Sequence, residues 1–539
     1  MWRWIIWSVL LGVGVLVVVC GVVVDRAAPI LQGRVIETLS ARFHSRVELD
    51  RLRVSAIRGL EISGEGLRIF APGDAVEAGA TTPLIAIGHF EFHTGLRGLF
   101  LKPMHVGVVH VTGMEIHIPP REMRWAGVRD ERSEAKIERA KVKIVVDELV
   151  CDDSRLVIGT EKAGRDPKVF ALGHIVLRDV GSDAAWSYEA TLENPVPKGD
   201  IRAQGTFGPW VDQSPGDSPV TGRYTFAHAD LNTIKGIGGV LSSVGEFAGK
   251  LNRIDVKGTA EVPNFSLDTA NHPMPLRTRF SAIVDGLSGD TTLQSVEARL
   301  GRTAFTCGGS VVNTKGVGHT IDLEVNAPDG RLEDFLQLAV KTRPVVMTAR
   351  VRMKTKLHLG PGRESVPQRL AMRGEFMLTG IHFSNARWQE QVNMVSLRAQ
   401  GYAAEAKPGA PEVETEMKGS FVMSGEKLTF SDLDYTMPGA TVALAGVYSL
   451  DGEEFDIRGK VRTVAKVSQM VSSWWKQILL YPANQVFQKN GAGAEIPVTI
   501  SGTKSEPKFG LDLFRDEKNK GIDKAQANRP PDRTRPRAK

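Results

Sequence analysis

The glycine clusters of this chain are the first candidates for chemistry, because glycine-rich loops can bind phosphate groups through their backbone N–H groups. Glycine-x-glycine sequences begin at Gly236, Gly316 and Gly491. A dinucleotide-binding loop carries a third glycine three residues further on, and these positions hold Leu241, Ile321 and Ile496. We interpret the three clusters as turns or loops and expect no cofactor.

Histidine and aspartate pairs are the second set of candidates. His89 and His93 are four residues apart, which is the spacing of two metal ligands on one helix face. They flank an alternating, strand-like segment, where the same spacing would separate them by about 13 Å on one sheet face. Asp152 and Asp153 are adjacent, so a strand would point them to opposite faces, and we interpret the pair as a turn. Neither pair predicts a metal site.

Other catalytic signatures are missing from the sequence. It contains no G-x-S-x-G, no H-E-x-x-H and no P-loop. Of its three cysteines, Cys20 lies in an apolar N-terminal run, so Cys151 and Cys307 are either one disulfide or, the interpretation we favour, two isolated thiols. A chain of 539 residues with so few catalytic groups is expected to hold or carry a ligand and not to be an enzyme.

The elements that would position any ligand are β-strands. The strand with the clearest alternating pattern is predicted from Met347 to Leu359. Its even positions are polar or basic, as at Arg350, Arg352 and Lys354. Its odd positions are almost wholly apolar: Met347, Ala349, Val351, Met353, Thr355, Leu357 and Leu359. Because side chains alternate along a strand, this pattern predicts one apolar and one solvated face.

Similar alternation recurs along the chain between glycine and proline punctuation. It predicts strands at Val47–Leu49, Gly66–Ile69, Ile85–Phe92, Val106–Ile118, Leu370–Leu378, Val442–Leu450, Phe455–Val461 and Ile496–Ile500. We therefore expect a mainly β protein: an elongated, curved antiparallel sheet, groove-like and built of repeated β units, with a few amphipathic helices.

Four segments have apolar residues at helical spacing: Pro29–Phe43, Leu231–Leu251, Arg331–Lys341 and Val467–Tyr481. Glycines weaken the second of them as a helix. For the last three, packing on the sheet is the interpretation we favour. The last segment carries Trp474 and Trp475, and for it a cap at one end of the β body or contact with a membrane surface stays open as an alternative.

The N-terminal stretch from Ile5 to Val24 is twenty residues long and uncharged. As a helix it would be about 30 Å long, the thickness of the hydrocarbon core of a bilayer. A cleaved signal peptide is the alternative, but its apolar core is usually shorter and ends in a small-x-small site, which Val24-Asp25-Arg26 does not provide. We expect a single transmembrane helix that stays attached.

The net charge of +6 is concentrated at the C-terminus. From Arg515 to Lys539 the chain has nine Lys/Arg and four Asp/Glu, a net +5, which leaves +1 for the remainder. The body is therefore close to neutral and gives little support to nucleic-acid binding. The tail, residues 515–539, is poor in apolar residues and is predicted to be disordered.

Three stretches resemble the AsmA family of bacterial envelope proteins, which includes the larger TamB and YhdP types. The first is the anchor followed by a helix and by Val47-Glu48-Leu49, Gly59–Ile62, Gly66–Ile69 and Leu96–Phe100. The second is Gly380–Phe383 followed by 419–446, and the third runs from Gly491 through Ile500–Thr503 to Phe509. The resemblance is looser between about residues 125 and 320.

The resemblance implies an inner-membrane protein with a cytoplasmic N-terminus and a periplasmic body that helps to carry phospholipid toward the outer membrane. It also suggests the domain boundaries: an anchor at 1–26, an AsmA-like N-terminal β region at 27–124 and a central β-rich region at 125–320. An AsmA-like C-terminal β region follows at 321–514, with a helix near 467–481, and then the basic tail at 515–539.

The alternating strands and the resemblance together lead to one hypothesis. We expect Met347, Val351, Met353, Leu357 and Leu359 to line an apolar β groove that binds phospholipid, because burying each CH₂ of an acyl chain gains about 0.8 kcal/mol. The alternatives are a closed β core and, in function, an anchored scaffold that affects outer-membrane protein or lipopolysaccharide assembly without carrying lipid. The sequence does not identify partner proteins in the envelope.

Overall fold

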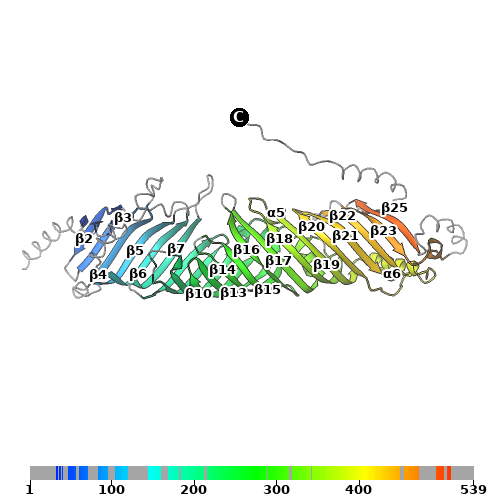
Figure 1. Ribbon diagram of the computed structural model, residues 1–539, viewed down its shortest axis with the longest axis horizontal. Coiled ribbons are helices and arrows are strands. Elements are labelled where there is room, and N and C mark those ends of the chain that lie inside the picture. The colour runs from blue at the N-terminus through cyan, green and yellow to red at the C-terminus, as the bar shows by residue number, and fades with distance from the viewer. Residues whose placement is uncertain are drawn as a thin grey trace, which may run out of the picture.

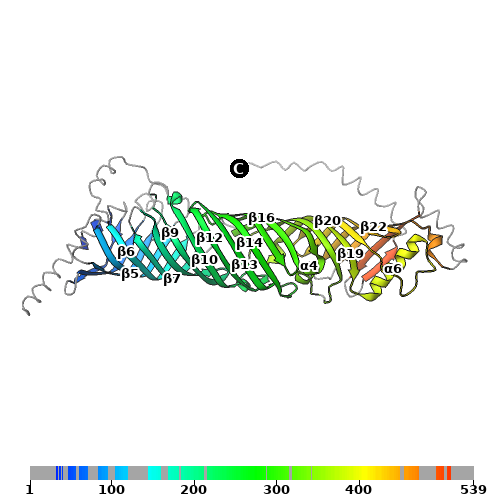
Figure 2. The same ribbon diagram turned by 90° about the horizontal axis from the view of Figure 1, so that it is seen from below.

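The computed structural model shows an elongated β body (Figures 1 and 2). It describes residues 32–33, 36–37, 39–40, 46–55, 60–70, 83–94, 104–118, 144–158, 168–180, 184–209, 211, 215–286, 288–314, 318–341, 343–449, 455–472, 493–502 and 507–511. Both the predicted anchor, Ile5–Val24, and the basic tail lie outside these residues.

Strands contain 68% of the described residues, and they form one sheet. Its first strands are β1 (Val47–Glu48), β2 (Arg51–Ser55), β3 (Leu60–Ile69), β4 (Ile85–Thr94), β5 (Met104–Ile118), β6 (Ile144–Ile158), β7 (Lys168–Val180), β8 (Trp186–Pro195) and β9 (Lys198–Phe207). The middle contains β10 (Pro219–Asp230), β11 (Ile237–Gly238), β12 (Val240–Lys250), β13 (Arg253–Leu267), β14 (Met274–Val284), β15 (Thr291–Leu300), β16 (Thr303–Thr314), β17 (Gly318–Arg331) and β18 (Met347–Leu359). The last part contains β19 (Leu370–Phe383), β20 (Glu416–Ser424), β21 (Lys427–Met437), β22 (Ala440–Ser449), β23 (Phe455–Thr463), β24 (Ala494–Gly502) and β25 (Pro507–Leu511).

The prediction of a mainly β protein with a curved sheet is confirmed, and the sheet stays unclosed. Consecutive long strands pair with one another from β3 to β25, so the chain advances along the sheet one strand at a time. The expectation of a wholly antiparallel sheet was wrong in one place, because β5 and β6 pair in parallel from Met104 opposite Ile144 to Ile118 opposite Ile158. A parallel pair needs a crossover connection between its two strands, whereas an antiparallel pair can be joined by a short turn.

Along many strands in the middle and last parts of the sheet, exposed residues alternate with half-buried or buried ones. The strand predicted from Met347 to Leu359 is confirmed as β18, and its exposure alternates as expected, with Arg350 and Lys354 exposed and Val351 buried. β9 and β13 alternate in the same way. We call the half-buried side the apolar face and the exposed side the polar face. Its lower exposure indicates that the apolar face lies on the inner side of the curve.

Glycines let the apolar face bend tightly in the middle of the sheet. Gly245 on β12 lies opposite Tyr224, and Gly258 on β13 lies opposite Phe280. A methyl group on Gly245 would lie 2.7 Å from the Tyr224 ring, and one on Gly258 would lie 2.9 Å from the Phe280 ring. The aromatic rings therefore lie over the glycines of neighbouring strands, where a side chain would displace them.

Two helices cover the apolar face along one edge of the sheet, and Figure 2 shows both at that edge. The helix predicted at Arg331–Lys341 is confirmed as α4 (Leu332–Ala339), whereas α6 (Ala386–Gln400) was not predicted. A short helix, α5 (Val366–Arg369), connects β18 to β19 on the opposite edge. At the N-terminal end, Ile36 and Leu39 of the predicted Pro29–Phe43 helix pack on a second core cluster of β1, β2 and β3 residues.

Of the other two predicted helices, one was wrong and the other lies mostly outside the described residues. Leu231–Leu251 is not a helix but a 3-10 turn, η4 (Leu231–Thr233), followed by β11 and most of β12. From Leu241 onward, apolar or small residues alternate with exposed ones, as in a strand. Glycine occupies two of the apolar-face positions, so the alternation is hard to recognise in the sequence. The segment predicted at Val467–Tyr481 begins with a 3-10 turn, η5 (Val467–Met470), and most of its remainder lies outside the described residues. No helix in the described part of the chain is long and apolar enough to span a membrane.

The apolar face should carry the stability of the sheet, and two valines offer a matched test. Val351 is 3% exposed in the main core cluster, and Val244 is 52% exposed on the polar face. We expect Val351→Ala to lower the free energy of unfolding by about 2 kcal/mol, through lost burial and a residual cavity. Val244→Ala should change it by less than about 0.5 kcal/mol. Urea unfolding of both variants checks this, and equal losses would contradict the assignment of the two faces.

Candidate functional site

The five residues predicted to face lipid all lie on the apolar face of β18, but they occupy two different environments. Val351 belongs to the main core cluster, and Met347 and Met353 pack against it. Leu332 and Phe335 of α4 and Ala399 of α6 complete this cluster. At this end of β18 the two helices therefore cover the apolar face.

A network of buried polar groups holds α4 in place. Asp334 is buried in the first turn of the helix, where it accepts a hydrogen bond from the Thr303 hydroxyl at 2.7 Å and one from the Arg302 backbone N–H at 3.1 Å. Its neighbour Glu333 is also buried and accepts from the Arg302 guanidinium at 3.0 Å. Carboxylates at a helix N-terminus also interact favourably with the helix dipole.

The second helix, α6, is fixed at both ends. The Asn385 side chain caps its start by accepting from the N–H groups of Arg387 and Trp388, and Gly401 ends it in the left-handed conformation. Ser396, which is fully buried, donates its hydroxyl hydrogen to the Pro438 carbonyl at 2.7 Å. These contacts lock α6 against the β21–β22 turn and keep the cluster closed.

The other half of β18 lies outside the core cluster that α4 and α6 cover, and α5 follows at its end. Leu357 lies between Leu323 of β17 and Met372 of β19, and Leu359 lies between Ile321 and Leu370. All six side chains are half-buried, and none belongs to the core cluster. We call these six residues the apolar patch. It includes Leu357 and Leu359, the two residues of the predicted lipid site that lie beyond the cluster covered by α4 and α6.

The polar face of β18 is occupied by cross-strand ion pairs. Lys356 Nζ lies 2.8 Å from Glu324, and His358 Nδ1 lies 2.7 Å from Asp322. The hydrogen bond and the charge of Lys356 lower the pKa of Glu324, so this carboxylate stays ionised to lower pH. Because β17 supplies acids opposite these bases, this part of the polar face is not a free cationic surface.

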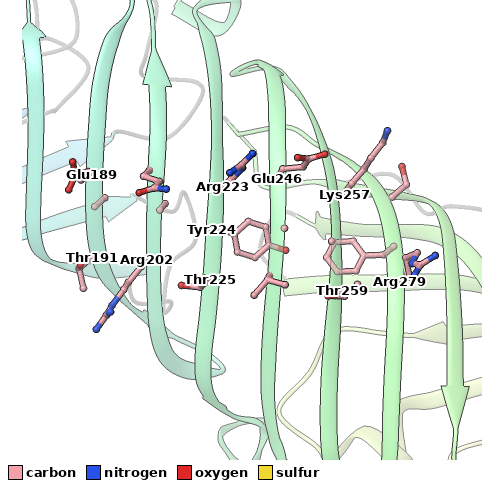
Figure 3. A pocket seen from close by; sticks show the side chains of 18 of the residues that line it. Glu189, Thr191, Arg202, Arg223, Tyr224, Thr225, Glu246, Lys257, Thr259 and Arg279 are labelled. Atoms are coloured by element: carbon pink, nitrogen blue, oxygen red, sulfur yellow. The ribbon is translucent and has the colours of Figure 1, made fainter.

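A hollow of about 1070 Å³ lies over the middle of the sheet (Figure 3). Its walls are mainly side chains of the polar face, including Arg223, Glu246 and Lys257. These charges alternate in sign, since Arg223 lies opposite Glu246 and Glu246 lies opposite Lys257. Apolar residues such as Ala203 and Phe280 line the hollow together with these charged side chains, and none of its lining residues belongs to the apolar patch.

The two cysteines of the β body are both free thiols, which excludes the disulfide left open by the sequence. Cys151 is fully buried, and burial followed by the charge of Asp152 raises its pKa to about 11. Cys307 is half-buried on the apolar face, in register with Val296 and Val325, and burial raises its pKa as well. Cys307 is therefore a native probe of the apolar face.

The polar candidates from the sequence do not come together. His89 lies on β4 and is exposed, and its imidazole is 3.9 Å from Glu91. The turn predicted at Asp152–Asp153 was wrong, because both residues lie within β6. Asp153 has a positive φ of 48° and interrupts the pairing there, and Asp152 contacts His174 at 2.7 Å. Among the described residues, no group of three or more His, Cys, Asp and Glu side chains could hold a metal ion.

Comparison of the chain with family models, with curated proteins and with solved structures finds no match.

The polar network beneath α4 gives a test of how the covered half is held. We expect Asp334→Ala to lower the free energy of unfolding by about 1–3 kcal/mol, because the buried Thr303 hydroxyl and Arg302 N–H lose their acceptor. The same change at Asp329, an exposed acid 3.6 Å from Arg350, should cost at most about 1 kcal/mol. Hydrogen exchange of the α4 amides should accelerate only in Asp334→Ala. Unchanged α4 protection in that variant would contradict the anchoring role.

Proposed function

We propose that this protein binds phospholipid acyl chains on the apolar face of its sheet and helps to carry them between membranes of a bacterial envelope. The observation that carries the proposal is the apolar patch, six apolar side chains from three adjacent strands that lie outside the cluster covered by α4 and α6. An unclosed sheet offers such a surface without the need to unfold. No charged side chain interrupts the patch, and an acyl chain needs only apolar contacts.

The length of the sheet supports transport along it. Strands follow one another from β3 to β25 at about 4.8 Å, so the apolar face extends roughly 100 Å across the strands. Each CH₂ buried on that face contributes about 0.8 kcal/mol, so a chain of several carbons would bind measurably. Because successive strands present similar apolar surface, the acyl chain could move from one strand to the next without a large free-energy barrier.

Membrane attachment is part of the proposal. The uncharged run from Ile5 to Val24 would anchor the chain in the inner membrane, with the body in the periplasm, and the resemblance to the AsmA family supports this location. Its position at the N-terminus would place the first strands of the sheet beside a source of lipid.

An anchored scaffold that affects outer-membrane assembly without carrying lipid is the second candidate. The observation that favours it is the closed cluster around Val351, where α4 and α6 already fill the apolar face. The two candidates differ in what occupies the apolar patch. Lipid occupies it in the first, and only neighbouring side chains contact it in the second.

Site-specific photocrosslinking in cells separates the two candidates. A photoreactive amino acid at Leu357 or Leu359 should capture phospholipid, and one at Met347, Val351 or Met353 should capture less, because α4 and α6 cover those positions. Lys356 and His358 are matched controls, since they are neighbours in β18 that point to the polar face. Capture only from the polar positions, including Arg350 and Arg352, would overturn the proposal, as would no capture from any position.

A further inference from the structure

The two edges of the curved sheet meet at one place. On one edge, the η4–β11 turn connects β10 to β12, and on the other edge α5 connects β18 to β19. The backbone N–H of Val366 donates to the carbonyl of Lys235, with an N···O distance of 3.0 Å. Since β12 to β18 lie between these two connections in the sheet, this contact bridges a long stretch of strands.

The contact is close packed at Gly236. Gly236 is buried and has a φ of +102°, and a methyl group on it would lie 2.6 Å from the Val366 nitrogen and 2.7 Å from Cδ of Pro367. Pro367 is buried in turn. A side chain at Gly236 would therefore separate the two edges, in addition to the strain that a positive φ imposes on any L-residue.

Each half of the contact is tied to its own part of the sheet. Gly236 accepts from the N–H of Asp268 at 3.1 Å, and Ile237 pairs with Leu267 at the end of β13. On the α5 side, Arg369 donates to the carbonyls of Gly360 at 2.5 Å and Glu364 at 3.0 Å, next to the end of β18. The contact thus joins two ordered sheet edges and is not a chance approach of two free loops.

We propose that the η4–β11 turn and α5 form a clasp that holds the two edges of the sheet together and closes the apolar face of β12 to β18 to entry from the side. If the protein binds lipid as proposed above, the clasp requires an acyl chain to reach the apolar patch lengthwise along the sheet. Gly236 and Pro367 are then the positions that determine where lipid can enter.

Disulfide trapping tests the contact itself. In the full chain with Cys20, Cys151 and Cys307 changed to alanine, the pair Lys235→Cys and Val366→Cys should crosslink on mild oxidation, because their hydrogen-bonded backbones lie within disulfide range. The control pair is Lys235→Cys and Lys427→Cys, which uses the β20–β21 turn further along the same edge as α5. The crosslinked peptides are identified by mass spectrometry. Equal yields for the two pairs, or no crosslink for the first, would overturn the clasp.

Labelling of the native Cys307 tests the closure. This thiol lies on the apolar face of β16, within the stretch that the clasp encloses. In the chain without Cys20 and Cys151, a small maleimide should label it, and a bulky polyethylene-glycol maleimide should react at least about tenfold more slowly relative to an exposed thiol. Gly236→Val should raise the rate with the bulky reagent by about fivefold or more, because it opens the clasp.

Gly409→Val is the matched control, since Gly409 also has a positive φ, of 86°, but open space around it. If Gly236→Val unfolds the protein, the Lys235→Cys/Val366→Cys chain that retains Cys307 provides a second test. The disulfide of its oxidised form locks the clasp, so the bulky reagent should label Cys307 more slowly in the oxidised form than in the reduced form. Bulky labelling as fast in the locked chain as in the reduced chain would overturn the proposal. Neither measurement contains lipid, so the clasp can succeed or fail independently of the proposed function.

Discussion

The structure depends on one constraint, which is that a long sheet with a continuous apolar face must keep that face out of water. The backbone hydrogen bonds are satisfied between neighbouring strands, so they do not require a second layer. The apolar side chains do require cover, and different parts of the chain provide it differently. Helix α4 and helix α6 cover the face around Val351, and flat aromatic rings over glycines cover it around Gly245 and Gly258. The apolar patch lies outside both of these regions and next to α5, and there a ligand could complete the cover.

The polar face is organised by the pairing of opposite charges. Opposite charges face one another across neighbouring strands, as at Lys356 and Glu324, so the face remains soluble without a large net charge. Exposed pairs of this kind contribute little stability. The free energy of folding, and of binding any apolar ligand, therefore comes mainly from the apolar face.

The sequence predicted strands where alternation is unbroken, because alternation is a local signal, but it identified none of the strands from β6 to β17. The prediction of Met347–Leu359 matches β18 at both ends, and its apolar positions lie on one face. The helix predicted at 231–251 failed because Ile234, Ile237 and Leu241 have helical spacing by coincidence, while glycines hide the strand alternation that follows. Helix α6 was missed although Asn385 and Gly401 are recognisable start and stop residues.

What the sequence could not show is contact between distant segments. That α4 covers Val351, and that Lys235 meets Val366, depends on the twist and curvature accumulated over many strands. The division of β18 into a covered half and the apolar patch follows from these contacts. It could not be inferred from alternation, which is the same along the whole strand.

The most direct test of the central claim is the lipid content of the purified protein. Phospholipid should remain with the full chain through purification in mild detergent and be quantified by mass spectrometry of the extract. The same purification of Leu357→Glu/Leu359→Glu should lose most of that lipid, because carboxylates in the apolar patch would exclude acyl chains. Lys356→Glu should retain it, because Lys356 lies on the polar face. Equal lipid in all three folded proteins, or none in the unaltered chain, would contradict the account.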